Sequence, residues 1–268
     1  MALRSKAAKR PATSTEPRRR AKAAGGTGSA ADFIPPNASL SALKKAAARC
    51  RGCDLYKDAT QTVFGDGPRR ARVMFVGEQP GDAEDKAGHP FVGASGKLLD
   101  RAMDAAGIDR DDAYVTNAVK HFKWAKDANG KRRIHKTPNR GEVRACFPWL
   151  GAEIARVQPE IIVCLGATAA KALMGPTFSV TKQRGVVQKT DWAPTLVATV
   201  HPSAVLRAPR PDRERQERAF IADLTRVARL LAKENRKRPM RARGKLLSWS
   251  ATEAPSPTSS AQTRSSRG

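Results

Sequence analysis

Two cysteines have the spacing of metal ligands, and a third cysteine and a histidine could complete a metal centre with them. Cys50 and Cys53 form a Cys-x-x-Cys pair, which brings two thiolates within reach of one metal site. Cys146 falls in a helical pattern, whereas Cys164 lies inside the apolar run EIIVCL and is predicted to be a core residue. His121, at the end of a predicted strand, is the best-placed additional ligand. Zinc and an iron–sulfur cluster both stay open here, because spacing does not separate them.

A basic segment, GKRRIHKTP (residues 130–138), has a histidine at its centre. Its cations Lys131, Arg132 and Arg133 are suited to hold phosphates. They would also disfavour a further positive charge on His135, and so keep its imidazole neutral and nucleophilic. We predict a loop that supplies both phosphate binding and a nucleophile.

A second histidine, His201, begins the motif HPSAVLR at the end of another predicted strand. Within this motif an apolar side chain, Leu206, precedes a cation, Arg207. This pairing is typical of a wedge that enters a DNA groove while the neighbouring cation binds a phosphate.

The loop GEQPGD (residues 77–82) follows a predicted buried strand and carries two acids and an amide. It lacks the GxGxxG spacing of a dinucleotide-binding turn. Glu84 and Asp85 come close behind, and the segment PFVG (residues 90–93) then brings an aromatic ring to the same strand end. A carboxylate, an amide and a ring face could together hold a flat heterocycle.

Alternating strand and helix patterns place these residues in an α/β fold. Strands are predicted over residues 72–76, 114–119, 160–165 and 195–200, and helices over about 39–48, 95–106, 142–157, 167–174 and 212–233. Strict alternation implies right-handed crossovers and a central four-stranded parallel sheet covered by helices on both faces. Ligands bind beyond the carboxyl ends of such strands, so one cleft is expected to gather the polar segments.

Charge and composition indicate a polyanionic partner. The chain of 268 residues holds 50 Lys and Arg against 25 Asp and Glu, a formal charge of +25, and nucleic acid is the commonest polyanion. No apolar run approaches the roughly 20 residues that a membrane span needs. Four cysteines in such a chain indicate a reducing interior rather than a disulfide-bonded secreted domain.

Both ends of the chain are predicted to be disordered basic tails. Residues 1–30 hold eight Lys or Arg against one acid, and residues 233–268 hold nine against two. Neither end has the apolar surface that would offset the entropy of ordering. We therefore expect a basic tail over 1–36, a folded domain over 37–235 and a basic, Ser/Pro-rich tail over 236–268.

Six ordered motifs within about residues 40–232 resemble the uracil-DNA glycosylase superfamily, in its iron–sulfur (family 4-like) branch. They are Cys50-x-x-Cys53, VFGDG (63–67), VGEQPGDAED (76–85), PFVG (90–93), VTNAVK (115–120) and HPS (201–203). The basic segment ending in His135 resembles that of the X-type glycosylases (UdgX). Members of that type cut uracil from DNA and stay covalently attached to the resulting sugar through this histidine.

The resemblance implies a three-layer α/β/α sandwich and a [4Fe–4S] cluster. Its ligands here would be Cys50, Cys53, His121 and Cys146. Ordinary members have cysteine where this chain has His121, and the X-type members share the histidine. Cys164 matches no ligand of the family.

The resemblance also implies which residues recognise the base. Phe91 would stack on a flipped uracil. Asn117 would read the polar edge of the uracil, since an amide offers both a donor and an acceptor. Gly77 belongs to the same substrate-binding group.

The implied chemistry passes through an oxocarbenium-like sugar, while negative charge grows on the departing base. His201 would donate to uracil O2 and stabilise that charge. Glu78 and Gln79 would position water in an ordinary member, whereas here His135 would bond to C1′ and end turnover. Asp85 would orient the loop or a water molecule.

We thus expect a uracil-DNA glycosylase of base-excision repair that becomes covalently linked to its abasic product. Its partner would be uracil-containing DNA, including single-stranded DNA, and the protein would be a cytoplasmic, nucleoid-associated monomer without a membrane segment. Two alternatives stay open. One is a turnover glycosylase that releases a free abasic site. The other is a zinc-stabilised nucleic-acid-binding protein without catalysis.

Overall fold

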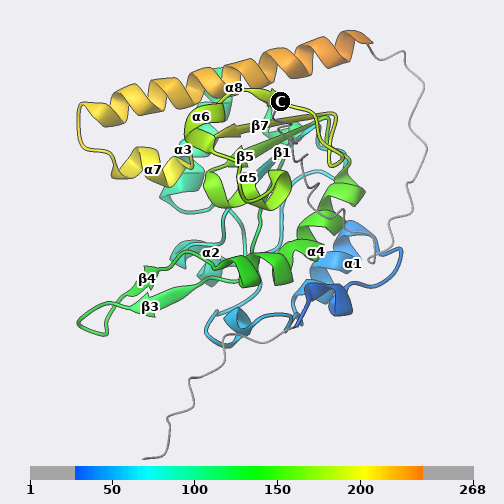
Figure 1. Cartoon of the computed structure of the whole chain (residues 1–268), viewed down its shortest axis with the longest axis vertical. Coiled ribbons are helices and arrows are strands. Elements are labelled where there is room, and N and C mark those ends of the chain that lie inside the picture. Colours follow the sequence, from blue (N-terminus) through cyan, green and yellow to red (C-terminus); the bar gives the residue numbers. More distant parts are fainter. Residues whose placement is uncertain (1–27, 238–268) are drawn as a thin grey trace, which may run out of the picture.

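The protein, seen here as a computed structural model, is described over residues 28–237, with side chains to residue 233 (Figure 1). Most of the two tails predicted over 1–36 and 236–268 lies outside these residues. A five-stranded sheet in the order β2-β1-β5-β7-β6 forms the centre of the fold. Its strands are β1 (Val73–Gly77), β2 (Ala113–Asn117), β5 (Ile161–Leu165), β6 (Val187–Gln188) and β7 (Thr195–Thr199).

The four predicted strands are parallel, as expected, but the sheet has five strands rather than four. β1 pairs with β2 and β5, and β5 pairs with β7, all in parallel. The additional strand, β6, runs antiparallel to β7 at the edge of the sheet. A strand of two residues is too short to show any periodicity in the sequence, which is why it was not predicted.

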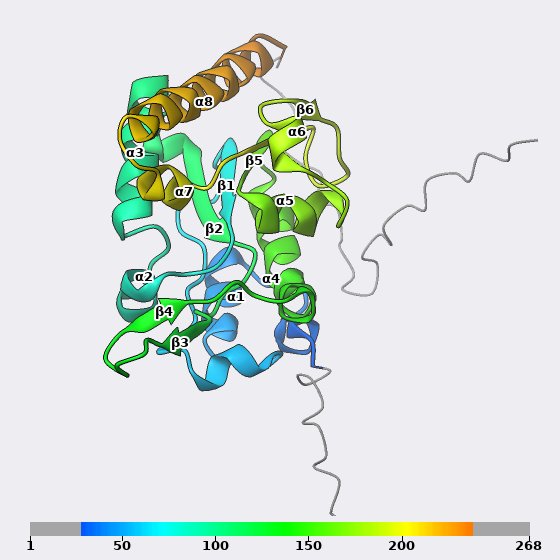
Figure 2. The same ribbon diagram turned by 60° about the vertical axis from the view of Figure 1, so that its left-hand side comes forward.

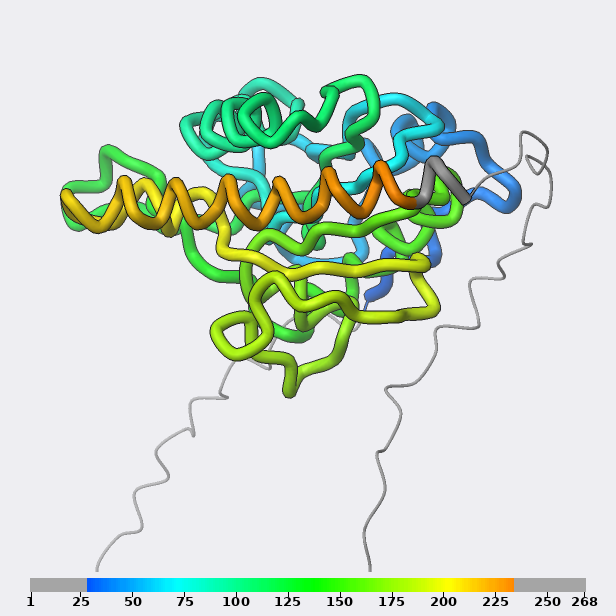
Figure 3. The backbone as a smooth tube through the Cα atoms, turned by 90° about the horizontal axis from the view of Figure 1, so that it is seen from above, coloured from blue at the N-terminus to red at the C-terminus, as the bar shows by residue number. Residues whose placement is uncertain are grey.

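Helices cover both faces of the sheet, which confirms the three-layer α/β/α sandwich (Figure 2). One face packs on α3 (Ala94–Ala106), α7 (Pro202–Arg207) and α8 (Asp212–Lys237). The other packs on α4 (Arg140–Val157) and α5 (Ala167–Met174), with α6 (Val180–Gln183) beside them. Viewed from above, α8 extends across most of the molecule (Figure 3). Because both faces are covered, β1, β2 and β5 are buried at every position.

Local signals set the helix boundaries. The Ser39 hydroxyl accepts from the Ala42 amide at 3.2 Å and caps α1 (Leu40–Ala47), as predicted. α3 ends at Gly107, whose φ of 73° suits a residue without a side chain. The remaining short elements are η1 (Ala30–Phe33), η2 (Asp54–Lys57), α2 (Asp82–Ala87) and η3 (Arg110–Asp112).

Two segments differ from their predicted states. Packed structure begins at least at Ala30 rather than at residue 37, because η1 packs against α4 within the segment assigned to the N-terminal tail. The basic segment is not a loop but the antiparallel hairpin β3 (Trp124–Lys126) and β4 (Arg133–His135), which projects from the body of the fold in Figure 1. Its strands have three residues each and are rich in charge, so they show no strand pattern.

Within residues 28–237, no helix combines the length and the apolar character that crossing a bilayer requires.

A buried ion pair lies at the carboxyl end of β2. Lys120 and Glu153 are both fully buried, and the Lys120 ammonium donates to the Glu153 carboxylate, the Thr116 hydroxyl and the Asn117 carbonyl. The carboxylate also accepts from the Gly65 amide at 2.9 Å. Every donor and acceptor of the pair is thus used within the protein, as a buried pair requires.

Replacing Lys120 by Met should destabilise the fold, because it leaves the Glu153 carboxylate buried without its cation. We expect the free energy of unfolding to fall by about 3–5 kcal/mol and the thermal midpoint to fall by roughly 6–20 °C in a melting experiment. Lys123→Met, at the solvent-accessible pair with Glu142, is the matched control and should lose at most about 1 kcal/mol. Lys120→Met/Glu153→Gln should melt above Lys120→Met alone. Equal losses in Lys120→Met and Lys123→Met would contradict this account.

Candidate active site

The polar segments that follow the strands meet at one edge of the sheet. Gly77 at the end of β1 is in register with Asn117 at the end of β2, and Leu165 of β5 is in register with Thr199 of β7. The four strands therefore end at one level, which brings their loops together. Contacts between these loops, described below, build the candidate site.

The end of β1 is closely covered by the two predicted base-recognition side chains. A Cβ atom at Gly77 would lie 2.3 Å from Asn117 Oδ1 and 2.8 Å from the tip of the Phe91 ring. A side chain at this position would therefore displace the Asn117 amide, the Phe91 ring or both. The Asn117 amide and the Phe91 ring lie side by side there, as recognition of a flat heterocycle requires.

The Phe91 backbone adopts a conformation that side-chain-bearing residues rarely take. Its φ is 58°, and the start of α3 holds it there, since a Cβ at Gly96 would lie 1.6 Å from the Phe91 carbonyl oxygen. Glu84 supports the same loop, because its carboxylate accepts from the Gly93 and Gly81 amides at 2.8 and 3.0 Å. Gly96 and Glu84 were not predicted as site residues. Their role depends on contacts between segments, although Glu84 stands in the recognised acidic run.

His201 is held as a neutral hydrogen-bond donor. It caps α7, and its Nδ1 accepts from the Ser203 amide at 3.1 Å, so the proton of the neutral ring is on Nε2. Burial lowers the pKa of His201 to about 4, and the charges of Arg207 and His135 act in the same direction. The imidazole is therefore neutral at pH 7. The centroids of the His201 and Phe91 rings are 6.3 Å apart, at an interplanar angle of 29°.

His135 lies on β4 and faces Glu78. Its Nε2 is 3.6 Å from Glu78 Oε1. Burial lowers the pKa of His135 below its usual value, Glu78 opposes this shift, and Arg207 adds to it. The ring is thus neutral, as predicted from the sequence. The reason differs from the prediction, since burial dominates and the contributing cation is Arg207 rather than the three cations of the hairpin.

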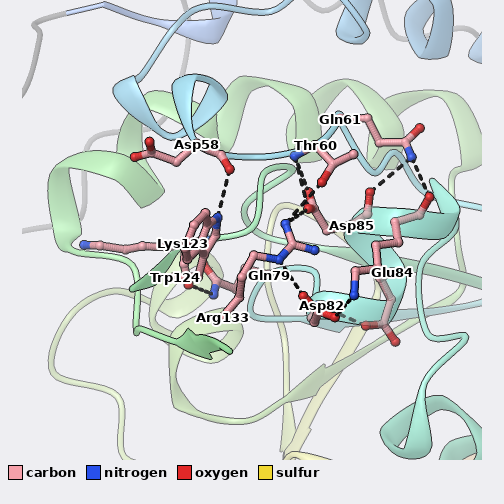
Figure 4. A network of polar contacts seen from close by, with 12 residues as sticks. Asp58, Thr60, Gln61, Gln79, Asp82, Glu84, Asp85, Lys123, Trp124 and Arg133 are labelled. Atoms are coloured by element: carbon pink, nitrogen blue, oxygen red, sulfur yellow. Dashed lines mark hydrogen bonds and ion pairs between the residues drawn. The ribbon is translucent and has the colours of Figure 1, made fainter. Parts of the chain in front are cut away.

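The cations of the hairpin divide into two groups. Lys131 and Arg132 are exposed at its tip. Arg133 instead points into the protein, where its Nε donates to Asp82 and its Nη1 to Asp85, both at 2.6 Å (Figure 4). Its guanidinium also lies over the rings of Phe122 and Trp124. Arg133 was predicted to bind DNA, but its guanidinium forms ion pairs with two carboxylates of the protein.

Asp85 and Gln79 position the hairpin as well. Asp85 is fully buried and accepts from the Thr60 amide at 3.0 Å in addition to Arg133. The Gln79 amide donates to the carbonyls of Lys123 and Lys136 at 3.1 and 3.2 Å and accepts from the Lys123 amide. With these three bonds the Gln79 side chain closes the base of the hairpin. Both polar atoms of the Gln79 side chain are therefore engaged with the hairpin.

The predicted DNA wedge is only partly exposed. Leu206 is half-buried and packs against the apolar cluster formed with α3 and α8. Arg207 is exposed, and its guanidinium donates to the Ser203 hydroxyl at 3.1 Å. The cation is therefore more accessible than the apolar side chain beside it.

The three predicted cysteine ligands gather in one buried region below the site. Cys50, Cys53 and Cys146 belong to a single apolar cluster. Burial raises the pKa of Cys53, and it raises the pKa of Cys146 to about 12, with the charge of Cys50 adding to both shifts. Cys164 is buried separately, in the cluster between the sheet and α4 and α5, as predicted for a core residue.

His121 has one ring nitrogen, Nδ1, without a hydrogen-bond partner among the described residues. The Thr62 hydroxyl donates to the Ala47 carbonyl at 2.9 Å, so it can only accept from His121 Nε2, 2.8 Å away. The same Ala47 carbonyl accepts from the Cys50 amide at 3.0 Å. His121 Nδ1 is therefore unprotonated, which is the form that binds metals, with the other nitrogen fixed by a hydrogen bond. Burial lowers the pKa of His121 to about 4 and keeps it neutral.

These residues fit an iron–sulfur cluster by their chemistry and burial. No three His, Cys, Asp or Glu side chains within residues 28–237 are grouped closely enough to hold a metal ion as they stand. The ligands of a [4Fe–4S] cluster lie farther apart than those of a single ion, because each protein ligand binds a different iron atom. The fully buried Nε1–H of Trp149, three residues after Cys146 on α4, has no hydrogen-bond partner among the described residues. An acceptor close to this helix would satisfy it.

Comparisons with known proteins agree with this fold. A family model described as the uracil DNA glycosylase superfamily matches residues 64–225. The chain is 40% identical to the type-4 uracil-DNA glycosylase of Thermotoga maritima over 162 residues, which are 59% of this chain and 79% of that protein. It is 34% identical to the type-4 uracil-DNA glycosylase of Archaeoglobus fulgidus over 203 residues, which are 73% of this chain and 95% of that protein.

The fold is an α/β/α sandwich whose strand-end segments bring together an amide, an aromatic ring and two neutral histidines. Because the family model spans more than half of the chain, the protein belongs to the uracil DNA glycosylase superfamily.

Replacing Arg133 should release the hairpin from the body of the fold. We expect Arg133→Leu to speed amide hydrogen exchange over residues 123–136 by about tenfold or more, since it removes two charge-assisted hydrogen bonds. Arg132→Leu removes the same charge from the exposed tip and is the matched control. Arg133→Lys keeps the charge without the two-pronged geometry and should give an intermediate rate. Equal exchange in Arg133→Leu and Arg132→Leu would show that Arg133 does not anchor the hairpin.

Proposed function

We propose that this protein removes uracil from DNA by breaking the bond between the base and C1′ of its sugar. The observation that carries the proposal is the placement of the Asn117 amide and the Phe91 ring together over Gly77. Similarity to the type-4 uracil-DNA glycosylases supports it. The target nucleotide would be flipped out of the stack into this site.

Base recognition follows from the two side chains. Phe91 offers a ring face on which a flat pyrimidine stacks. The Asn117 amide offers a donor and an acceptor to the pyrimidine edge. Gly77 leaves room for both, because any side chain there would collide with them.

Bond cleavage leaves the electron pair of the glycosidic bond on uracil and a cationic carbon at C1′. The Nε2–H of neutral His201 would donate to uracil O2, where the negative charge grows. A neutral donor placed in advance needs no rearrangement as that charge develops. The Glu78 carboxylate would stabilise the positive charge on the sugar.

His135 would then capture the sugar. The lone pair of an unprotonated ring nitrogen forms the bond to C1′, and the product is an imidazolium joined to DNA. The negative charge of Glu78 lies next to that imidazolium, with His135 Nε2 3.6 Å from Oε1. Because this bond is not hydrolysed, the protein would act once. Gln79 is engaged at the base of the hairpin, which leaves Glu78 as the group that could position a competing water.

The same proposal includes a [4Fe–4S] cluster held by Cys50, Cys53, His121 and Cys146. When bound, the cluster would supply a structural cross-link between the segment after α1, the end of β2 and α4. The Lys120 amide, which donates to Cys146 Sγ at 3.2 Å, ties this region to the base-recognition strand.

DNA contacts and the organisation of the chain belong to the proposal as well. Lys131, Arg132 and Arg207 are exposed cations that would bind phosphates of uracil-containing DNA, single strands included. The glycosylase domain would cover residues 37–235 together with the packed segment that begins at Ala30. The protein would act as a monomer in the cytoplasm, at the nucleoid.

The function is tested by mixing the purified protein with uracil-containing single-stranded DNA and separating the products on a denaturing gel. We expect a slower band that resists heat and detergent, formed by wild type and lost in His135→Ser. Ile134→Ser changes the exposed neighbour on the same strand and should keep the band. Free abasic DNA without an adduct would identify a turnover glycosylase. No uracil release by wild type would support a non-catalytic DNA-binding protein.

The cluster is tested by metal analysis of the purified protein. We expect iron and acid-labile sulfide in equal amounts, retained in His121→Cys and lost in His121→Ala, because cysteine can replace histidine as a ligand. Cys164→Ala removes a buried thiol outside the proposed set and should keep its iron. Zinc in place of iron, or full iron in His121→Ala, would contradict the proposed site.

A further inference from the structure

The turn after β5 brings a hydroxyl into the site that no motif had identified. Thr168, the second residue of α5, donates a hydrogen bond from Oγ1 to Glu78 Oε2. The two residues are 90 positions apart in the chain and follow different strands. Thr168 is the third residue after the end of β5, and this place after a strand end is the one sequence signal that could have pointed to it.

The two oxygens of Glu78 have different neighbours. Oε2 accepts from Thr168, whereas Oε1 faces His135 Nε2 at 3.6 Å. Within the described part of the chain, Thr168 is the one side chain that donates a hydrogen bond to this carboxylate. The hydroxyl therefore sets the rotation of the carboxylate, and with it the direction in which Oε1 points.

Thr168 is itself well placed to act as a fixed point. The Gly166 amide donates to the Thr199 carbonyl at 2.9 Å, and a Cβ at Gly166 would lie 3.1 Å from His201 Cβ. Ala169 and Ala170, which follow Thr168 on α5, are fully buried against the sheet. His135, in contrast, lies on the projecting hairpin. Glu78 thus lies between Thr168, at the packed start of α5, and His135, on the projecting hairpin.

We propose that Thr168 is a positioning residue that orients the Glu78 carboxylate and so directs capture of the sugar to His135 rather than to water. The inference rests on the proposed function. After the C1′–N1 bond breaks with its electron pair on uracil, a His135 nitrogen donates its lone pair to C1′. The product imidazolium keeps its ring proton, and its charge faces Oε1. Without the hydroxyl, the carboxylate can turn and hold a water at C1′ instead, which would yield a free abasic site.

The test compares Thr168→Val with Thr168→Ser in single-turnover reactions on uracil-containing single-stranded DNA. Valine has nearly the shape of threonine but no hydroxyl, whereas serine keeps the hydroxyl. Adduct is measured on a denaturing gel, free abasic sites by alkaline cleavage, and folding by the thermal midpoint. Thr177→Val, an exposed threonine outside the site, is the matched control.

We expect Thr168→Val to form adduct about 10- to 100-fold more slowly, as loss of a hydrogen bond to a charged group implies, and to release a larger share of free abasic sites. Thr168→Ser should lie within about threefold of wild type on the same basis. The share of free abasic product is the decisive readout, because partial unfolding lowers the total amount of product without changing this ratio.

Three outcomes would overturn the inference. If wild type traps uracil-DNA and Thr168→Val does so at the same rate and ratio, Thr168 does not direct capture, while the proposed function stands. If Thr168→Ser is as impaired as Thr168→Val, the hydroxyl is not the cause. If wild type releases no uracil, the proposed function fails, and the inference fails with it.

Discussion

A buried ammonium and a buried carboxylate must pair and satisfy their hydrogen bonds within the protein. Lys120 and Glu153 form such a pair in this fold. The consequences extend to both functional regions. The Lys120 side chain binds the carbonyl of Asn117, whose amide faces the candidate base site, and its backbone amide binds Cys146 in the candidate metal site. Glu153 binds the Gly65 amide in the loop before β1. Hydrogen bonds of Lys120 thus connect the ion pair to both the strand end that carries Asn117 and the helix that carries Cys146.

The candidate nucleophile is presented in a different way from the rest of the site. Asn117 and His201 follow directly from sheet strands, so the register of the sheet places them. His135 lies on a small hairpin outside the sheet, and its position depends on side-chain clamps from Gln79 and from Arg133 with Asp85. Polar residues beside the candidate nucleophile therefore hold the hairpin in place. An appended hairpin allows a histidine to enter the site without any change to the sheet.

Burial contributes more than neighbouring cations to the lowered pKa of both site histidines, although the His135 side chain is only partly buried. Burial is the largest cause that lowers the pKa of both His135 and His201, and the nearby cation that adds to each shift is Arg207. Two neutral rings and the Glu78 carboxylate then face the position where a cationic sugar would form. A site of this kind can stabilise positive charge on the sugar and still offer an uncharged donor to the leaving base.

The sequence by itself determined the parallel sheet, the helices on both faces and the level at which the polar loops end. This information is local. An apolar run such as IIVCL indicates a buried strand, and caps such as Ser39 and Gly107 indicate where a helix begins and ends. The edge strand β6, the hairpin and the packed turn at Ala30 were missed, since they are too short for a pattern. Only the tertiary structure decided that Arg133 and Gln79 hold the hairpin and that Thr168 meets Glu78. Such partnerships join residues 44 to 90 positions apart, and no local pattern encodes which distant side chains will meet.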